Sequence, residues 1–511
     1  MNKFLKIVGA VTLINIVARV FGFFREAVIG YQYGSSRIAD SIFTAYNIPN
    51  FLYLVIGGAF TTAFISIYNR KKTDQALFIK QSFTIVAMTG IVLAIIILVF
   101  TTPILNLIYR KTDLTVAEFE MTKHLFYWMM PSSILLMLSS WYSGLLNVNS
   151  KFHLSSVAIL IYNVFFLIIG VVFSNIIGPI AYGISALASA VIMIFFLIRG
   201  YRQLDSYSVG LSFVRTHSTR DLWIMVFPLA IGGGTVQIYA MLQRFFAAFL
   251  GLGDSAVAVV NYASRLTQFP QSILITAVTT VIYPILSRKE AEDDHQSIKG
   301  LYGKGLHYLL LLMGPVTIYS YFYAESLVQV IFEYRKFTAE DTAITAPVVA
   351  ILALSMFFLA ATMYITRFYY AKGDSMAPVV LSIVNVFIIN IGAMYFFADN
   401  GFGADAIAWG TLISSITNTL MLIAYASFKY DLKLGDGLNK IELLKPIVPF
   451  IVLTCITYIS SEYLVFDYKW VTFIAGIVIF TFSTIMLYML FRIKEINQVY
   501  IKLKSKFIKT K

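Results

Sequence analysis

The sequence predicts an all-α integral membrane protein with about fourteen transmembrane helices. Of its 511 residues 59% are hydrophobic and 13% are charged, and the mean hydropathy is +0.78. A soluble domain is about 45–50% apolar and about 25% charged, so this composition excludes the soluble class. The apolar residues also fall in runs of about 20, the length that a helix needs to cross a bilayer.

The first apolar run resembles a signal peptide, but Arg19 interrupts it and no small-x-small cleavage pattern follows. We therefore interpret it as the first membrane helix. The connections between runs are short, and the longest polar ones are expected near 201–221 and 286–302. The expected spans are residues 6–30, 38–68, 78–108, 122–147, 154–175, 179–199, 222–250, 255–285, 303–331, 342–371, 377–397, 403–427, 443–463 and 470–492.

The placement of lysine and arginine predicts the orientation. With the N-terminus inside, 27 of the 39 basic residues fall on the cytoplasmic side, 7 fall outside and 5 lie within spans. Both termini are then cytoplasmic. Basic loops beside an anionic leaflet account for the net charge of +13, so we expect contact with membrane lipids and not with nucleic acid.

A weak internal repeat relates spans 1–2 to spans 7–8. In each pair an arginine precedes a glycine turn by nine residues, a proline follows in the next span, and a basic stop ends it. A repeat unit of six helices predicts two parallel halves related by an axis along the membrane normal. We expect an N-terminal lobe over 1–200, a cytoplasmic linker over 201–221, a C-terminal lobe over 222–427, and two further spans with a basic cytoplasmic tail over 428–511.

Five arginines lie inside the expected spans, where a charge at mid-depth costs a few kcal/mol and therefore usually faces a cavity or a partner. They are Arg19, Arg25, Arg244, Arg265 and Arg367. At a rise of 1.5 Å per residue, Arg19 lies about 20 Å from Lys6, and Arg265 lies about 16 Å from the turn at Asp254. Both are thus expected near mid-depth, one from each half.

The spacing leaves a structural interpretation open for each charge. Arg25 and Asp40 flank the outer turn at similar height, so we expect them to form an ion pair. Glu26, about two helical turns from Arg19, is expected to compensate charge. For Arg244 a snorkelling or structural role is favoured, and for Arg367 a cytoplasmic anchor. If the ligand is a phosphate, arginine suits it because the guanidinium makes bidentate bonds and stays charged.

The chain resembles the MurJ (MviN) family, the lipid II flippases of the MOP exporter superfamily. The resemblance covers most of the chain and is carried by ARVFGFFREAVIGYQYG, ADSIFTAYNIPNF, GAFTTAF, NYASRLTQFP, YPILSRKEAE, FEYRKFTAEDT and TRFYYAKGDSMAPV. It implies two pseudo-symmetric six-helix lobes of the MATE/MOP type, two C-terminal helices with a groove for a polyprenyl tail, and a cationic central cavity. It further implies a multi-pass protein of the bacterial cytoplasmic membrane.

The family's cavity residues match Arg19, Arg25, Asp40 and Arg265, which we predict to bind substrate. Glu26, Arg244 and Arg367 are possible secondary contacts. The chain departs from the pattern after Asn50, since Tyr53 and Leu54 stand where many members are basic, and Gly57 or Gly58 replaces an acidic residue. These departures favour a family branch that moves another polyprenyl-linked saccharide.

Three functions compete. The first is a flippase for an undecaprenyl-diphosphate-linked peptidoglycan precursor, lipid II, acting by alternating access. The second is a flippase of the same superfamily for another polyprenyl-linked saccharide, of capsule, exopolysaccharide or O-antigen type. The third, a glycosyltransferase, needs an acid/base constellation on a sizeable outer loop, and the outer loops are short.

We accordingly expect no catalytic residue, no bound metal and no cofactor. No GxxxxGK[ST] phosphate loop is present, so energy is expected from the membrane potential, an ion gradient or substrate consumption. We expect a monomer. The single cysteine, Cys455, lies in an apolar run and is interpreted as a small core residue.

Overall fold

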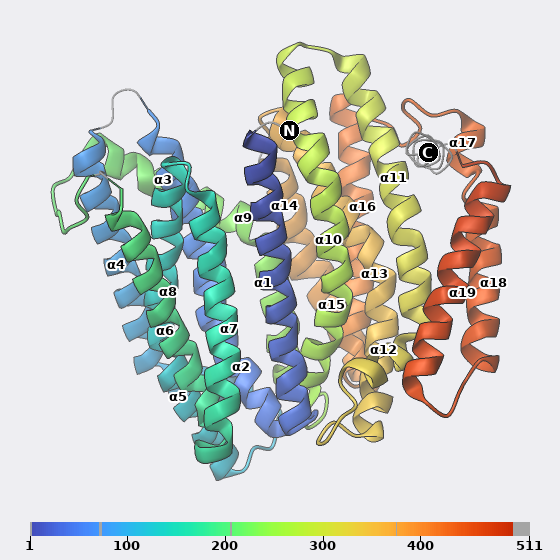
Figure 1. Cartoon of the computed structure of the whole chain (residues 1–511), viewed down its shortest axis with the longest axis horizontal. Coiled ribbons are helices and arrows are strands. Elements are labelled where there is room, and N and C mark those ends of the chain that lie inside the picture. The colour runs from blue at the N-terminus through green and yellow to red at the C-terminus, as the bar shows by residue number, and fades with distance from the viewer. Residues whose placement is uncertain (1–2, 71–73, 205–206, 375, 494–511) are drawn as a thin grey trace, which may run out of the picture. The chain divides into compact units, whose positions relative to one another are not determined.

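The computed structural model describes residues 3–70, 74–204, 207–374 and 376–493, and these residues form helices and no strand (Figure 1). Contacts divide the chain into two compact units. The first unit comprises Met1–Asn261 and Arg335–Phe337, and the second comprises Tyr262–Tyr334 and Thr338–Lys511. The predicted lobes, with a linker over 201–221, were drawn from an internal repeat and stay a prediction.

The first unit is built around α6, which packs against α2, α3, α4 and α8, while α7 packs against both α1 and α8. A capping box formed by Thr115 and Glu118 satisfies the first backbone amides of α6 and fixes where this helix begins. The helices of this unit are α1 Lys3–Tyr33, α2 Arg37–Phe51, the π-helix η1 Leu52–Gly57, α3 Gly58–Tyr68, α4 Gln75–Val99, α5 Thr101–Ile108, α6 Val116–Val148, α7 Phe152–Ile177, α8 Ile180–Arg202 and α9 His217–Phe249. Helix α10 Ala256–Ala291 begins in this unit and ends in the second.

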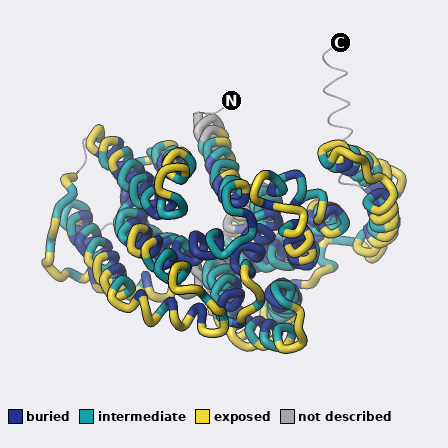
Figure 2. Tube along the Cα trace, turned by 90° about the horizontal axis from the view of Figure 1, so that it is seen from below, coloured by how far each residue is buried: buried dark blue, intermediate teal, exposed yellow. Residues whose placement is uncertain are grey.

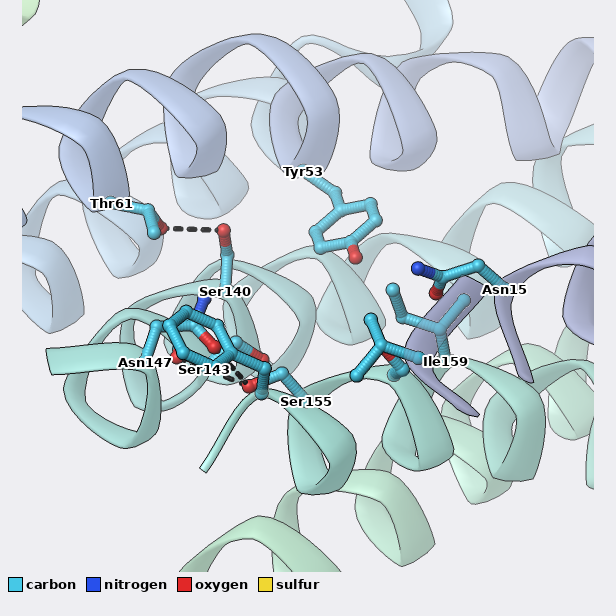
Figure 3. Close-up of a pocket in the computed structure, with 11 residues that line it drawn as sticks. Asn15, Tyr53, Thr61, Ser140, Ser143, Asn147, Ser155 and Ile159 are labelled. Carbon is cyan, nitrogen blue, oxygen red and sulfur yellow. Dashed lines mark hydrogen bonds between the residues drawn. The ribbon is translucent and has the colours of Figure 1, made fainter. Parts of the chain in front are cut away.

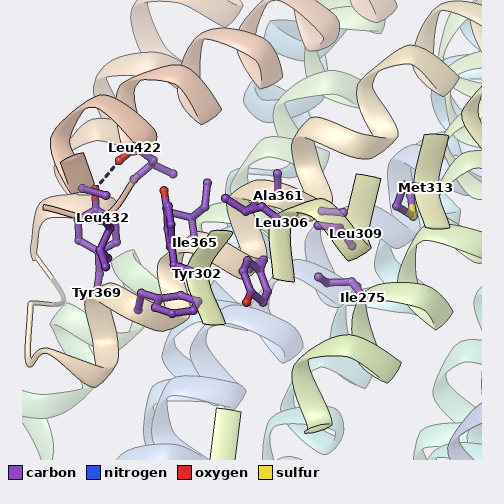
Figure 4. Packing of buried hydrophobic residues seen from close by; sticks show 14 of the residues in the cluster. Ile275, Tyr302, Leu306, Leu309, Met313, Ala361, Ile365, Tyr369, Leu422 and Leu432 are labelled. Atoms are coloured by element: carbon purple, nitrogen blue, oxygen red, sulfur yellow. Dashed lines mark hydrogen bonds between the residues drawn. The ribbon is translucent and has the colours of Figure 1, made fainter. Parts of the chain in front are cut away.

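The second unit is built around α13, which packs against α11, α12 and α16. Its helices are α11 His295–Phe322, α12 Ala324–Ile331, α13 Ala339–Ala371, α14 Met376–Val384, the π-helix η2 Asn385–Asn390, α15 Ile391–Asp399, α16 Asp405–Tyr430, α17 Lys440–Leu444, α18 Ile447–Tyr463 and α19 Lys469–Leu490. Buried apolar side chains of α10, α11, α13 and α16 pack into a core cluster (Figure 4). Gly305 leaves no room for a Cβ against the hydroxyl of Tyr364, which donates to the carbonyl of Leu301 at 2.8 Å.

Each predicted span falls on a helix or on a broken helix of the described chain. Within the described residues, nine helices are long and apolar enough to cross a membrane. The chain is therefore a multi-pass membrane protein, and the count of fourteen crossings stays a prediction. Buried residues lie mostly where helices face one another, and exposed residues follow loops and outward faces (Figure 2).

The predicted first hairpin is confirmed, with its turn at Gly34 and Ser36. Gly34 has a φ of +66°, a conformation that glycine adopts without strain. Ser36 then caps α2 by accepting the amide of Ala39 at 3.4 Å. The second predicted span continues through Pro49 into η1, so a π-helix interrupts it.

Two expectations about local structure need correction. The polar connection expected over 286–302 is mostly helix, because α10 continues to Ala291 and Asp294 caps α11 from the next turn. Cys455 is exposed and not in the core, because an apolar helix in a bilayer can turn an apolar residue outward.

Candidate substrate-binding site

Arg25 is the most deeply buried arginine of the predicted set, with 5% of its surface exposed. Its Nη2 donates to Oε1 of Glu26 at 2.9 Å, and its Nη1 donates to the hydroxyl of Tyr46 at 3.1 Å. The guanidinium also lies over the rings of Tyr46 and Phe166, at 4.5 and 4.9 Å from the centroids. Aromatic faces stabilise a desolvated cation, so this charge is held in one place on α1.

Glu26 is the carboxylate that neutralises Arg25, with 1% of its surface exposed. Its second oxygen accepts the amide of Asn261 at 3.0 Å. The expectation that Glu26 compensates a nearby charge is confirmed. The expected pair between Arg25 and Asp40 is wrong, because Glu26 directly follows Arg25 in α1 and occupies its guanidinium.

Asp40 instead accepts a backbone hydrogen bond. Its Oδ1 takes the amide proton of Ala258 at 2.6 Å, and 5% of its surface is exposed. One turn earlier on α2, Arg37 donates to Asp254 at 2.5 Å and to the carbonyl of Asp113 at 3.2 Å. The start of α2 is thus bonded both to the turn before α10, at Asp254, and to the first turn of α10, at Ala258. We call these two contacts the α2–α10 latch.

Arg19 lies six residues before Arg25 on α1 and is exposed. The helix is continuous through Gly22, which faces Asn163 of α7. Asn163 donates to the carbonyl of Ala18 at 3.1 Å, so α7 covers the side of α1 beside Arg19. Arg19 and Arg25 therefore have different surroundings, one exposed and one enclosed by rings and a carboxylate.

The remaining predicted arginines are half-buried. Arg244 of α9 donates to Oδ1 of Asn47 at 2.7 Å, within the first unit, which agrees with a structural role. Arg265 lies on the part of α10 that belongs to the second unit, and Arg367 lies on α13. A common phosphate site for Arg19 and Arg265 stays a prediction.

Sequence reasoning missed the neutral partners of these charges, namely Tyr46, Asn47, Phe166 and Asn261. For two of them, Asn47 and Asn261, the helical spacing in the sequence could have indicated the contact. Asn47 follows Asp40 by seven residues on one helical run, and Asn261 precedes Arg265 by four, so each lies on the same helix face as a charge that had been singled out. The π-helix η1 was also missed, although it carries Tyr53 and Leu54, two of the positions that depart from the family pattern.

Within the described residues, no group of three or more histidine, cysteine, aspartate or glutamate side chains is placed to hold a metal ion.

The fold and these buried charges define a class, the polytopic helical membrane proteins with charged side chains buried among their spans. A family model described as "Lipid II flippase MurJ" matches residues 29–481. The chain belongs to this family.

Individual relatives agree. The chain is 26% identical over 487 residues to "Probable lipid II flippase MurJ" of Rickettsia prowazekii. The matched residues cover 91% of this chain and 94% of the relative. It is 25% identical over 423 residues to "Lipid II flippase MurJ" of Burkholderia cenocepacia, covering 80% and 81%.

Solved structures support the fold. The structure of "Lipid II flippase MurJ, inward closed conformation" superposes with a TM-score of 0.79 at 21% identity, covering 94% of this chain and 98% of that one. An inward-facing multidrug resistance MATE transporter of the MOP superfamily gives a TM-score of 0.69 at 12% identity, covering 81% and 98%. The predicted MATE/MOP type of fold is thereby confirmed.

Proposed function

We propose that this protein moves an undecaprenyl-diphosphate-linked peptidoglycan precursor, lipid II, across the bacterial cytoplasmic membrane. The observation that carries the proposal is the match to the flippase family over residues 29–481. The protein acts as a transporter and not as an enzyme, since moving the head group across the bilayer requires binding and conformational change but no bond cleavage.

The diphosphate is bound by arginines, in this proposal by Arg19, Arg25 and Arg265, with Arg244 and Arg367 as secondary contacts. A guanidinium matches phosphate oxygens in a bidentate fashion. Arg25 already has a carboxylate partner in Glu26. A phosphate oxygen therefore competes with Glu26 for Arg25, and the displaced carboxylate keeps its bond from Asn261.

The α2–α10 latch, which includes Asp40, closes one end of the first unit in this proposal. By the predicted topology that end faces outward. Alternating access then requires the bonds of Asp40 to Ala258 and of Arg37 to Asp254 to break when the head group is released outside. Substrate binding is linked to the latch through α10, because Asn261 lies one turn beyond Ala258.

The transport cycle uses no bound cofactor in this proposal. It is driven by the membrane potential, by an ion gradient or by consumption of the product outside. The protein works as a monomer with both termini in the cytoplasm, and its partners are the substrate lipid and the surrounding bilayer.

A second candidate substrate rests on one observation. Tyr53 and Leu54 stand on η1 where many family members are basic, so the head group meets fewer cations there. Such a change suits a polyprenyl-linked saccharide with fewer negative charges, of capsule, exopolysaccharide or O-antigen type.

Depletion of the protein in its native host tests the proposal. We expect lipid II to accumulate on the inner leaflet, followed by lysis, and restoration when the full chain is expressed again. A normal lipid II distribution with a lost capsule or exopolysaccharide would contradict the lipid II proposal and favour the second substrate.

A further inference from the structure

A pocket of about 360 Å³ lies in the first unit between α1, η1, α3, α6 and α7 (Figure 3). Eleven residues line it, and none of them is acidic, basic or histidine. Its polar groups are amides and hydroxyls, including those of Asn15, Tyr53, Thr61, Ser140, Asn147 and Ser155. Its volume falls in the lower part of the range of ligand pockets, about 300–1,000 Å³.

Part of this polar lining is satisfied by the protein. Thr61 and Ser140 share a hydrogen bond at 2.7 Å, and Ser155 donates to Oδ1 of Asn147 at 2.9 Å. By contrast, the hydroxyl of Tyr53 and the amide of Asn15 form no hydrogen bond with any described residue, and they point toward each other across the pocket (Figure 3). Together they present donors and acceptors to whatever occupies it.

The π-helix places Tyr53 at the pocket. The wider turns of η1 follow Pro49, which cannot donate a backbone hydrogen bond, and π-helical turns are common at functional sites. The end of η1 is held close to α6, where a Cβ on Gly57 would lie 3.3 Å from Cβ of Ser140. The hydroxyl of Thr61 accordingly bonds to both the carbonyl of Gly57 and Ser140.

The lining of the pocket disfavours a charged ligand. A phosphate or a peptide carboxylate taken out of water requires a cation or several amide donors, and the pocket offers no cation. An apolar chain would leave the groups of Asn15 and Tyr53 unsatisfied. The ligand should therefore be uncharged and able to hydrogen-bond to Asn15 and Tyr53. A sugar ring fits, because its hydroxyl and acetamido groups are neutral donors and acceptors, and the ring of Phe152 offers it an apolar face.

We infer that this pocket binds one sugar ring of the lipid-linked head group, with Asn15 and Tyr53 as the residues that recognise it. This inference rests on the proposed function, and it adds a subsite beside the arginines. Asn15 lies four residues before Arg19, so their Cβ atoms are about 5–6 Å apart on one face of α1. A diphosphate on Arg19 therefore places the directly attached sugar next to Asn15.

The test compares two lipids on the full-length protein in nanodiscs. One is undecaprenyl diphosphate, which carries no sugar, and the other is lipid II. We expect Tyr53→Phe and Asn15→Ala each to weaken lipid II binding about fivefold, the value of one neutral hydrogen bond, and to leave undecaprenyl diphosphate binding unchanged. Matched controls are Tyr127→Phe on an exposed face of α6 and Asn175→Ala on an exposed face of α7, which should bind both lipids like the wild type.

The remaining outcomes overturn the inference. Equal losses for both lipids would make these residues structural or phosphate-directed, and unchanged lipid II binding would remove them from recognition. If the wild type bound both lipids equally, the sugar subsite would fail while the flippase proposal stood. If the wild type bound neither lipid, the proposed function would fail as well.

Discussion

The two halves of α1 carry opposite chemistry. In its first half, Asn15 faces a neutral pocket and makes no hydrogen bond with the described residues. In its second half, Arg25 and Glu26 are buried and bonded to each other, and their neighbours add a ring hydroxyl and an amide. A buried charge is strongly destabilising unless the protein pairs it. A neutral polar group that faces a cavity costs less, because water or a ligand can satisfy its hydrogen bonds.

The comparison separates residues that hold the fold from residues that are open to cargo. The ion pair of Arg25 and Glu26 stabilises the bundle and becomes a substrate contact only by exchanging partners. Asn15 and Tyr53 cost little to leave open because they are neutral and face a cavity. Arg19 is exposed one helical turn from Asn15. Substitutions should therefore act on stability in the second half of α1 and on binding in the first.

The largest effect is expected from removing one partner of the buried pair. Glu26→Ala leaves the guanidinium of Arg25 without its carboxylate, and such a loss costs about 3–5 kcal/mol. We expect a marked fall in the thermal stability of the detergent-purified protein and in its yield. The double variant Arg25→Met with Glu26→Gln should recover most of the stability without recovering transport. A stable Glu26→Ala protein would contradict the structural role of the pair.

A smaller effect distinguishes the observed pair from the one the sequence suggested. In double-mutant cycles on thermal stability, Arg25→Ala and Glu26→Ala should couple by about 1–3 kcal/mol, because they remove one interaction. Arg25→Ala and Asp40→Ala should add within about 0.5 kcal/mol, since Asp40 bonds to Ala258 instead. Coupling of Arg25 with Asp40 but not with Glu26 would reverse this assignment.

The latch predicts an intermediate loss. Asp40→Ala leaves the amide of Ala258 unsatisfied, at a cost of about 1–3 kcal/mol, whereas Asp40→Asn keeps an acceptor in place and should cost less. Stability should rank wild type, Asn, then Ala in the purified protein. If Asn and Ala lose stability equally, the carboxylate charge and not the hydrogen bond is what α2 requires.

The smallest effect belongs to a charge outside the spans. Burial raises the pKa of Asp374, but hydrogen bonds from Lys429, Tyr430 and the amide of Ala377 outweigh it and lower the pKa to about 2. A lowered pKa stabilises the fold above the ordinary value near 3.8 and loses that contribution as the pH falls toward 2. Asp374→Asn should thus cost on the order of 1 kcal/mol at pH 6, and the difference from wild type should shrink below pH 4. A difference that does not vary with pH would exclude this ion pair as its source.

The sequence predicted the helical membrane fold and the first hairpin, because apolar run length is a strong signal. Of the five arginines within the expected spans, only Arg25 is buried in the structure. The sequence did not predict which carboxylate pairs with Arg25, since helix spacing favoured Asp40 across the turn while the adjacent Glu26 reaches the guanidinium by side-chain rotation alone. It also missed η1, because a π-helix leaves no periodicity in a uniformly apolar run. Cys455 shows the same limit, as apolar context does not separate a core face from a lipid face.

The central claim is that Arg19 and Arg265 bind the diphosphate of lipid II during flipping. In cells depleted of their own flippase, the direct measurement is the fraction of lipid II that a membrane-impermeant, lipid II-cleaving enzyme reaches from outside. Each variant should be expressed at the wild-type level, as checked by immunoblot.

The wild type should expose lipid II, Arg19→Ala and Arg265→Ala should leave it inaccessible, and lysine at either site should restore it in part, because lysine lacks the bidentate fork. Arg367→Ala, at a residue favoured as a cytoplasmic anchor, should have a mild effect. External lipid II at the wild-type level in Arg19→Ala or Arg265→Ala cells with normal expression would contradict the account.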